Sequence, residues 1–209
     1  MPWHNVEAAF SLHPIIRTYS LRTIAMNAKP AVKSALTDIK TLREQARRHI
    51  EDGAVTAGYS ANRTEVLRLL NAALATELVC VLRYRRHHFM ARGLASQSIA
   101  DEFMTHSNEE QGHADRIAER IVQLGGEPDF APDGLSSRSH AEYVAADSLI
   151  DMIREDLVAE RIAIDSYREM IRYLEDDDPT SSRMLKDILA VEEEHAEELS
   201  DLLEGLPKR

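Results

Sequence analysis

The chain has 209 residues, 29% charged and 44% hydrophobic, which is a folded globular composition and excludes a disordered chain. One cysteine excludes an intrachain disulfide and a CxxC-type zinc or rubredoxin iron site, and no apolar run approaches the length of a membrane span, so we expect a cytoplasmic protein without a membrane partner. The net charge of -11 is uneven: residues 1–50 hold 8 basic against 3 acidic side chains, and the remainder holds 17 against 33. Such an acidic body attracts cations, and a basic segment can attract nucleic acid.

The first 61 residues divide into two segments. Residues 1–26 are patchily apolar and make a poor signal peptide, so we interpret them as a disordered arm or as sequence upstream of a start at Met26. Residues 27–61 are expected to hold an N-terminal helix and a linker. Apolar residues recur at helical spacing over 31–50, and Gly53 follows as a stop signal.

Four long helical segments follow over residues 62–205, which we expect to form one domain. Asn62 caps the first segment, which ends near Gly93. Ser96 or Ser98 opens the second segment, which ends at a pair of glycines. Short connections of this kind join antiparallel neighbours, so these two segments form a hairpin.

A long connection separates the second segment from the third. Residues 127–139 contain two prolines and a glycine, which mark a crossover loop. Ser139 and Glu142 have capping-box spacing, so a short helix is predicted to lead into the third long helix, at about 148–175.

The fourth segment completes the predicted fold. Asp178 caps it with Pro179 at its first position, and Gly205 closes it. Since the connection in the middle is long and the other two are short, the second and third helices run parallel. We therefore predict an all-α four-helix bundle with one long crossover, plus an extra N-terminal helix.

Glutamate and histidine recur at matching positions in these helices. Glu110 and His113 lie three residues apart, and Glu192 and His195 repeat this spacing. Positions three apart share a helix face, so each pair can reach one metal ion. One such pair is common by chance, but two pairs in matching helices are far less so.

The first and third helices supply the remaining partners. Glu77 and Glu160 each lie among apolar residues, 33 and 32 residues before the glutamate of the following pair. Tyr84 and Tyr167 each follow these glutamates by seven residues. The two halves of the chain are therefore one helical hairpin repeated.

Four carboxylates in a core repel one another and require a counter-charge. Two divalent cations would neutralise them, so we predict a carboxylate-bridged dinuclear centre. The alternative is that glutamates face water, which we expect of Glu193, Glu194, Glu197 and Glu198. The predicted metal-binding and catalytic residues are Glu77, Glu110, His113, Glu160, Glu192 and His195.

Other candidates are weaker. His106 lies one turn before Glu110, where it is an outer contact of the centre, a transient stop for iron, or an ordinary helix residue. Tyr84 and Tyr167 are the other expected outer contacts. Cys80 is expected to fill the core. Residues expected at the surface are His87, His88 and Glu109.

Over residues 62–204 these positions resemble the ferritin-like di-iron superfamily, and bacterioferritin within it. The resemblance implies that Glu110 and Glu192 bridge two metal ions and that Glu77 and Glu160 are terminal ligands. It further implies two iron ions per subunit, with manganese or zinc as alternatives. Tyr84 matches a tyrosine that donates a hydrogen bond near the site in that family.

Departures from the family pattern carry further expectations. The position after the second-helix ligand, a haem-binding methionine in bacterioferritin, is Gln111 here, so no haem is expected. Only 14 residues follow His195, too few for the fifth helix of a 24-subunit cage, so a homo-oligomeric, Dps-like shell of 12 subunits is preferred. Rubrerythrins carry another glutamate where this chain has Ala163.

Three functions fit this pattern. The first is a ferroxidase that oxidises Fe²⁺ with O₂ or H₂O₂ and deposits Fe³⁺ in a protein shell, for storage or protection from oxidative stress. The second is a non-storage enzyme, either like manganese catalase or a di-iron peroxidase or oxygenase. The third is a Dps-like DNA-protecting protein that uses basic residues of the N-terminal segment: Lys29, Lys33, Lys40, Arg43, Arg47 and Arg48.

Overall fold

The computed structural model describes residues 36–91 and 96–206, which hold helices and loops without a strand. The described residues from Ile39 onward belong to one compact unit. The predicted arm, 1–26, lies outside the described residues, and the predicted boundaries at residues 26 and 61 stay predictions.

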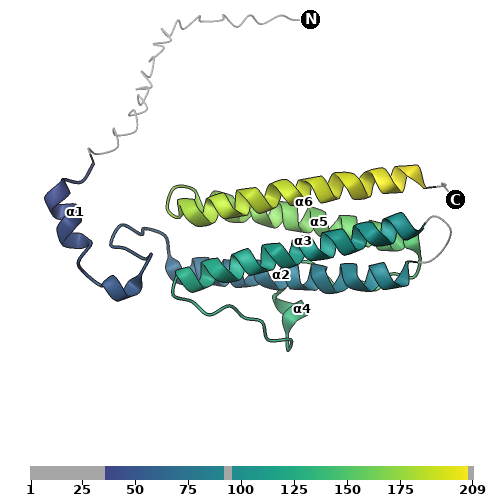
Figure 1. Cartoon of the computed structure of the whole chain (residues 1–209), viewed down its shortest axis with the longest axis horizontal. Coiled ribbons are helices and arrows are strands. Elements are labelled where there is room, and N and C mark those ends of the chain that lie inside the picture. The colour runs from purple at the N-terminus through teal and green to yellow at the C-terminus, as the bar shows by residue number, and fades with distance from the viewer. Residues whose placement is uncertain (1–35, 92–95, 207–209) are drawn as a thin grey trace, which may run out of the picture. The chain divides into compact units, whose positions relative to one another are not determined.

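Four long helices form the bundle: α2 (Arg63–Met90), α3 (Ser96–Gln123), α5 (Leu149–Leu174) and α6 (Pro179–Gly205). Helix α2 packs along α3, and α5 packs along α6 (Figure 1). Contacts of α2 with α5 and of α3 with α6 join the two hairpins. The prediction of an all-α four-helix bundle with a long crossover between the second and third long helices is confirmed. No helix among the described residues is long and apolar enough to cross a membrane.

Polar side chains cap the long helices where the sequence indicates. The side chains of Asn62, Ser148 and Asp178 each accept a hydrogen bond from the backbone N–H three residues later. Each cap satisfies one of the free N–H groups that begin a helix. The caps predicted at Asn62 and Asp178 are confirmed, and Gly205 is the last residue of α6.

The short helix of the crossover was placed incorrectly. Helix α4 spans Leu135–Arg138. Ser139, which was expected to open a helix, is instead the residue that follows the end of α4. The hydroxyl of Ser139 instead donates to the carbonyl of Ala141 and accepts from its N–H. Because this tight turn occupies the hydroxyl, Ser139 caps no helix start.

The N-terminal helix is shorter than predicted. Of the range 31–50, the described part is helical only in α1 (Ile39–Gln45) and in the first residue of a 3₁₀ turn at Ile50–Asp52. No side chain of α1 is buried. A short helix that buries no apolar face is marginal, because most helical stability comes from packing.

The bundle core consists of two apolar clusters with the predicted ligands between them. We call one cluster the His113 end; Leu70, Leu74, Ile117, Leu185 and Ile188 are among its buried residues. The other, the His195 end, includes Cys80, Tyr84, Phe103, Ile153 and Leu199. In every long helix the ligand glutamate falls between residues of the two clusters, so the centre lies at the middle of the bundle.

Candidate metal centre

The six predicted ligands converge in the core. Each is at most 5% exposed, and all four long helices contribute. They form two overlapping groups, and within each group one ligand atom per residue lies within 4.8 Å of the others. Glu110 and Glu192 belong to both groups. The first group adds Glu77 and His113, and the second adds Glu160 and His195.

The two imidazoles face the shared carboxylates. Nδ1 of His113 lies 2.9 Å from Glu192 and 3.2 Å from Glu110. Nδ1 of His195 lies 3.5 Å from Glu192 and 3.6 Å from Glu110. Glu77 joins the first imidazole at 3.6 Å. The shared carboxylates therefore lie between two histidines, as bridging ligands would.

Burial changes the proton affinity of the outer carboxylates. Desolvation, followed by the charges of Glu110 and Glu192, raises the pKa of Glu77 well above its usual value. The pKa of Glu160 is raised by the same causes in the same order. In the metal-free core these two side chains therefore favour the protonated form.

The histidines and Glu110 shift in the complementary directions. Burial opposes the charged form of His113, but the close carboxylates of Glu110, Glu192 and Glu77 outweigh it and raise its pKa to about 12. Burial likewise opposes charge on His195, and its carboxylate neighbours raise its pKa to about 12. Burial also opposes the ionised form of Glu110, yet its close contacts with the two histidines lower its pKa. Without metal, the raised pKa values therefore favour protonated histidines beside an ionised Glu110.

Several buried atoms at the centre lack partners. Among the described residues, no hydrogen bond reaches Oε1 of Glu110, Oε2 of Glu160, either carboxylate oxygen of Glu192, or Nδ1 of His195. Unpaired buried polar atoms are costly and rare in native proteins. Oxygen and imidazole donors suit Fe²⁺, Mn²⁺ and Zn²⁺. The residues present therefore fit a pair of divalent cations.

The two tyrosines contact the outer carboxylates across the halves of the chain. The hydroxyl of Tyr84 donates to Glu160, and that of Tyr167 donates to Glu77. Both tyrosines are buried. Hydrogen bonds of this kind fix the orientation of a ligand carboxylate, so each hairpin orients the terminal glutamate of the other.

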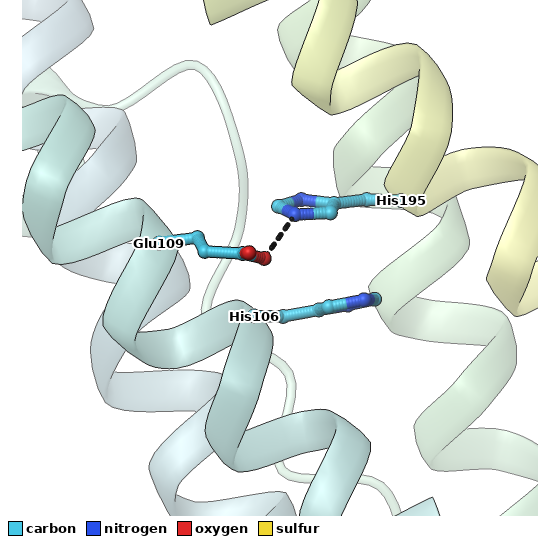
Figure 2. A group of neighbouring side chains, drawn as sticks. All are labelled: His106, Glu109 and His195. Carbon is cyan, nitrogen blue, oxygen red and sulfur yellow. Dashed lines mark hydrogen bonds and ion pairs between the residues drawn. The ribbon is translucent and has the colours of Figure 1, made fainter.

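Two further side chains extend from the centre at the His195 end. Nε2 of His195 donates to Glu109 at 2.8 Å, and the ring of His106 stacks on that of His195 with centroids 4.1 Å apart (Figure 2). A metal-binding histidine typically donates its second N–H to a carboxylate, which leaves the other nitrogen for the metal. Glu109 was expected only to face solvent, so its contact with His195 was missed.

One of the glutamates expected in water also reaches this region. Oε2 of Glu198 lies 2.9 Å from Nε2 of the fully buried His106, and the Glu198 side chain is 44% exposed. Glu198 faces water in part, as expected, but its contact with His106 was missed. Glu193, Glu194 and Glu197 are exposed as predicted.

A buried network close to the centre was also missed. Asp156 accepts hydrogen bonds from Arg83 and His87, each at 2.8 Å, and all three are almost fully buried. The surface prediction for His87 was wrong. Helical spacing could have identified both residues. Asp156 lies four residues before Glu160, and His87 lies three residues after Tyr84, so each shares the buried face of its helix with a residue of the predicted centre.

The four helices, the long crossover and the buried glutamate and histidine residues define the class, a ferritin-like bundle. The chain belongs to the Ferritin family, whose ferritin-like domain matches residues 67–208. It is 31% identical to a bacterioferritin of Mycobacterium bovis over 145 residues, which cover 69% of this chain and 87% of the relative.

Solved structures agree in fold. A dodecameric thioferritin, a bacterioferritin-related protein from Bacteroides fragilis, superposes with a TM-score of 0.66 at 29% identity, covering 69% of this chain and 87% of that one. A ferritin-like di-iron carboxylate protein from Bacillus anthracis str. Ames has a TM-score of 0.61 at 28% identity, covering 69% and 99%. The family match over residues 67–208 includes all six predicted ligands.

Proposed function

We propose that the protein is a ferroxidase that oxidises Fe²⁺ with O₂ or H₂O₂ and stores or detoxifies the Fe³⁺ in a protein shell. The observation that carries this proposal is the pair of overlapping ligand groups, whose buried oxygen and nitrogen atoms lack other partners. Membership of the ferritin family and the similarity to bacterioferritin support iron as the substrate.

Each ligand has a distinct role in this proposal. Glu110 and Glu192 belong to both ligand groups, so both Fe²⁺ ions would share these two carboxylates. Glu77 with His113 would complete one position, and Glu160 with His195 the other. Two bound Fe²⁺ ions supply the two electrons that reduce one O₂ to H₂O₂, or one H₂O₂ to two H₂O, with two protons consumed in either case. The carboxylates favour the Fe³⁺ product, because anionic oxygen ligands suit the harder ion.

The proposed assembly is a homo-oligomeric shell of 12 subunits. The solved thioferritin that this chain resembles is a dodecamer, and this chain covers 87% of its length. A shell of this kind would separate the ferric product from the surrounding solution. A cytoplasmic location and the lack of haem stay predictions.

Anaerobic loading with excess Fe²⁺, exposure to air or peroxide, and gel filtration with iron detection test storage directly. Iron far above two ions per subunit that elutes with a large shell would support the proposal. Iron that stops near two per subunit would identify a fixed cofactor and favour an enzyme like manganese catalase or a di-iron peroxidase or oxygenase. The metal content of the protein from its native host would separate those alternatives.

DNA protection is a second, compatible proposal. Lys40, Arg43, Arg47 and Arg48 are exposed, while Lys29 and Lys33 lie outside the described residues. If these charges bind phosphates, DNA affinity should fall steeply as salt rises and vanish when residues 1–50 are deleted. DNA affinity that does not change with salt concentration would contradict this proposal.

A further inference from the structure

The repeated hairpin provides an internal comparison between the two ends of the centre. Matching Glu77 with Glu160 assigns each residue of α2 a counterpart in α5 at the same offset. Under this matching, the two tyrosine–glutamate hydrogen bonds are counterparts, and both cross between α2 and α5. Since these helices belong to different hairpins, the orientation of each terminal glutamate depends on how α2 and α5 are set against each other.

A buried ionic bridge joins the same two helices at the His195 end. Nε of Arg83 donates to one carboxylate oxygen of Asp156 at 2.8 Å, and Nδ1 of His87 lies 2.8 Å from the other oxygen. None of the three side chains is more than 1% exposed. Arg83 and His87 lie four residues apart on one face of α2, so they hold the carboxylate at two points. Two such contacts restrict both the sliding and the rotation of α5 on α2.

Helical spacing places this bridge one turn from a predicted ligand. Asp156 lies four residues before Glu160, so the two share a face of α5 and are separated by about 6 Å along its axis. On α2, Tyr84 lies between Arg83 and His87 in the sequence and donates to Glu160. Hydrogen bonds weaken steeply when their atoms are displaced or misaligned, so a shift of α5 by about 1 Å would weaken the Tyr84 bond.

The His113 end has no equivalent of this bridge among its matching residues. Arg83, His87 and Asp156 correspond to Ser166, Met170 and Ala73. The hydroxyl of Ser166 donates to the carbonyl of Ala163 in its own helix, and neither Met170 nor Ala73 carries a charge. The two metal positions therefore differ in how firmly their terminal glutamate is held.

We propose that Asp156 is a positioning residue for the metal position at His195: its bridge to α2 fixes α5 and thereby keeps Glu160 directed at the cation. This inference rests on the proposed dinuclear centre. The bridge also contacts the crossover, because Arg83 donates to the carbonyl of Glu142. An anchor for that loop alone is the purely structural alternative.

Anaerobic titration of the full-length metal-free protein with Co²⁺ alone, measured by equilibrium dialysis, separates the two roles. The wild type should bind two Co²⁺ per chain. In Asp156→Asn one of them should weaken by about tenfold, within the range typical of lost outer contacts, while the other is kept. Crystals grown at limiting Co²⁺ identify the weakened position. Compared with the wild type, the variant should lose anomalous signal beside His195 and keep it beside His113.

Asp178→Asn is the matched control at the other end. Asp178 is the buried partner of Arg120 at 2.8 Å, and it lies 14 residues before Glu192, about 20 Å along α6. This variant also loses a buried counter-charge, and asparagine keeps a side-chain oxygen that can cap α6. Urea unfolding should show a loss of stability in both variants, but Asp178→Asn should bind both Co²⁺ as the wild type does. Equal weakening of both Co²⁺ in the two variants would overturn the positioning role.

Two further variants protect the test from a folding artefact. Arg83→Lys keeps the charge but loses the planar donor group, so it should weaken the same Co²⁺ by a smaller factor. In the Tyr84→Phe background, Asp156→Asn should cause little further loss, because both changes release the same carboxylate. Losses that multiply in the double variant would overturn the positioning role and leave the proposed function standing. Fewer than two Co²⁺ in the wild type would contradict the dinuclear centre, and this inference with it.

Discussion

The two ends of the bundle share a framework and differ in what surrounds it. Each end has a glutamate and histidine three apart, and a tyrosine whose hydroxyl donates to the terminal glutamate of the same end from the other hairpin. Next to these ligands the His113 end has the apolar Ile117 and Ile188, and its buried ion pair, Arg120 with Asp178, lies farther along the helices. The His195 end buries His87, His106 and Asp156. The counterparts of His87 and Asp156 are Met170 and Ala73. The two ends therefore share the predicted ligands and their tyrosine contacts, and they differ in the polar side chains next to those ligands.

The network at the His195 end also holds the crossover. Arg83 donates to the carbonyl of Glu142, and His87 lies 3.1 Å from the carbonyl of Ala145. Both side chains also contact Asp156 on α5. The loop between the hairpins is thus fixed to the bundle close to the ligands, which explains why charged residues are buried there.

The largest expected effect comes from a ligand that both ends share. Glu110→Ala removes one bridging carboxylate, so both positions fail together. We expect Fe²⁺ oxidation to slow by more than about 100-fold, beyond the 10–100-fold typical of lost outer contacts. Stopped-flow absorbance measures this rate, and circular dichroism should show unchanged helices. Normal kinetics in this variant would remove the assignment of the centre, and Glu194→Gln is the charge-matched control.

Asp156→Asn tests the difference between the two ends by its effect on the free energy of unfolding. It leaves Arg83 without its buried counter-charge, and breaking such a pair costs about 3–5 kcal/mol. At the other end, Met170→Leu replaces the counterpart of His87 with a side chain of similar volume and should cost less than about 1.5 kcal/mol. Urea unfolding of the metal-free protein measures both. Equal losses of unfolding free energy in the two variants would show that the Asp156 network does not make the two ends differ in stability.

The tyrosines sharpen the comparison, since they are the contacts that the two ends share. Tyr84→Phe removes the hydrogen bond to Glu160, and Tyr167→Phe removes the one to Glu77. We expect each to weaken anaerobic Fe²⁺ binding by about tenfold, because each frees one terminal carboxylate. Equilibrium dialysis should give similar losses. A loss in only one variant would mean that the hairpins do not orient each other's ligands equally.

The last prediction concerns the pH dependence of stability. The pKa of His113 and of His195 rises from the ordinary 6.5 to about 12 on folding without metal, and the pKa of Glu77 also rises. Groups with raised pKa values stabilise the fold below their unfolded pKa, and this contribution is lost as pH rises toward the folded value. Glu110 has the opposite sign, but its contribution is lost only at acidic pH.

Thermal unfolding at several pH values measures this effect. The Tm of the metal-free protein should fall as pH rises from neutral toward 12, while Zn²⁺ binding strengthens because it displaces the same protons. The difference in Tm between the loaded and metal-free protein should therefore widen with pH. A difference in Tm that does not change with pH would contradict the raised pKa values of His113 and His195.

Sequence spacing predicted the fold and gathered the six candidate ligands, because helical periodicity fixes which residues share a face. It could not show that Tyr84 reaches Glu160 instead of its own helix's Glu77, since that depends on how α2 and α5 are set against each other. His87 was misplaced for the same reason: its partners are Asp156 and the crossover loop, both distant in sequence. The hydrogen bond between His106 and Glu198 likewise joins two residues that are 92 positions apart in the sequence.

Anomalous scattering from crystals grown with Zn²⁺ tests the central claim most directly, because it locates each cation against named side chains. We expect two strong peaks in the core that both contact Glu110 and Glu192, one beside His113 and the other beside His195. A single core peak, or a core without peaks while Zn²⁺ binds elsewhere on the chain, would contradict the dinuclear centre.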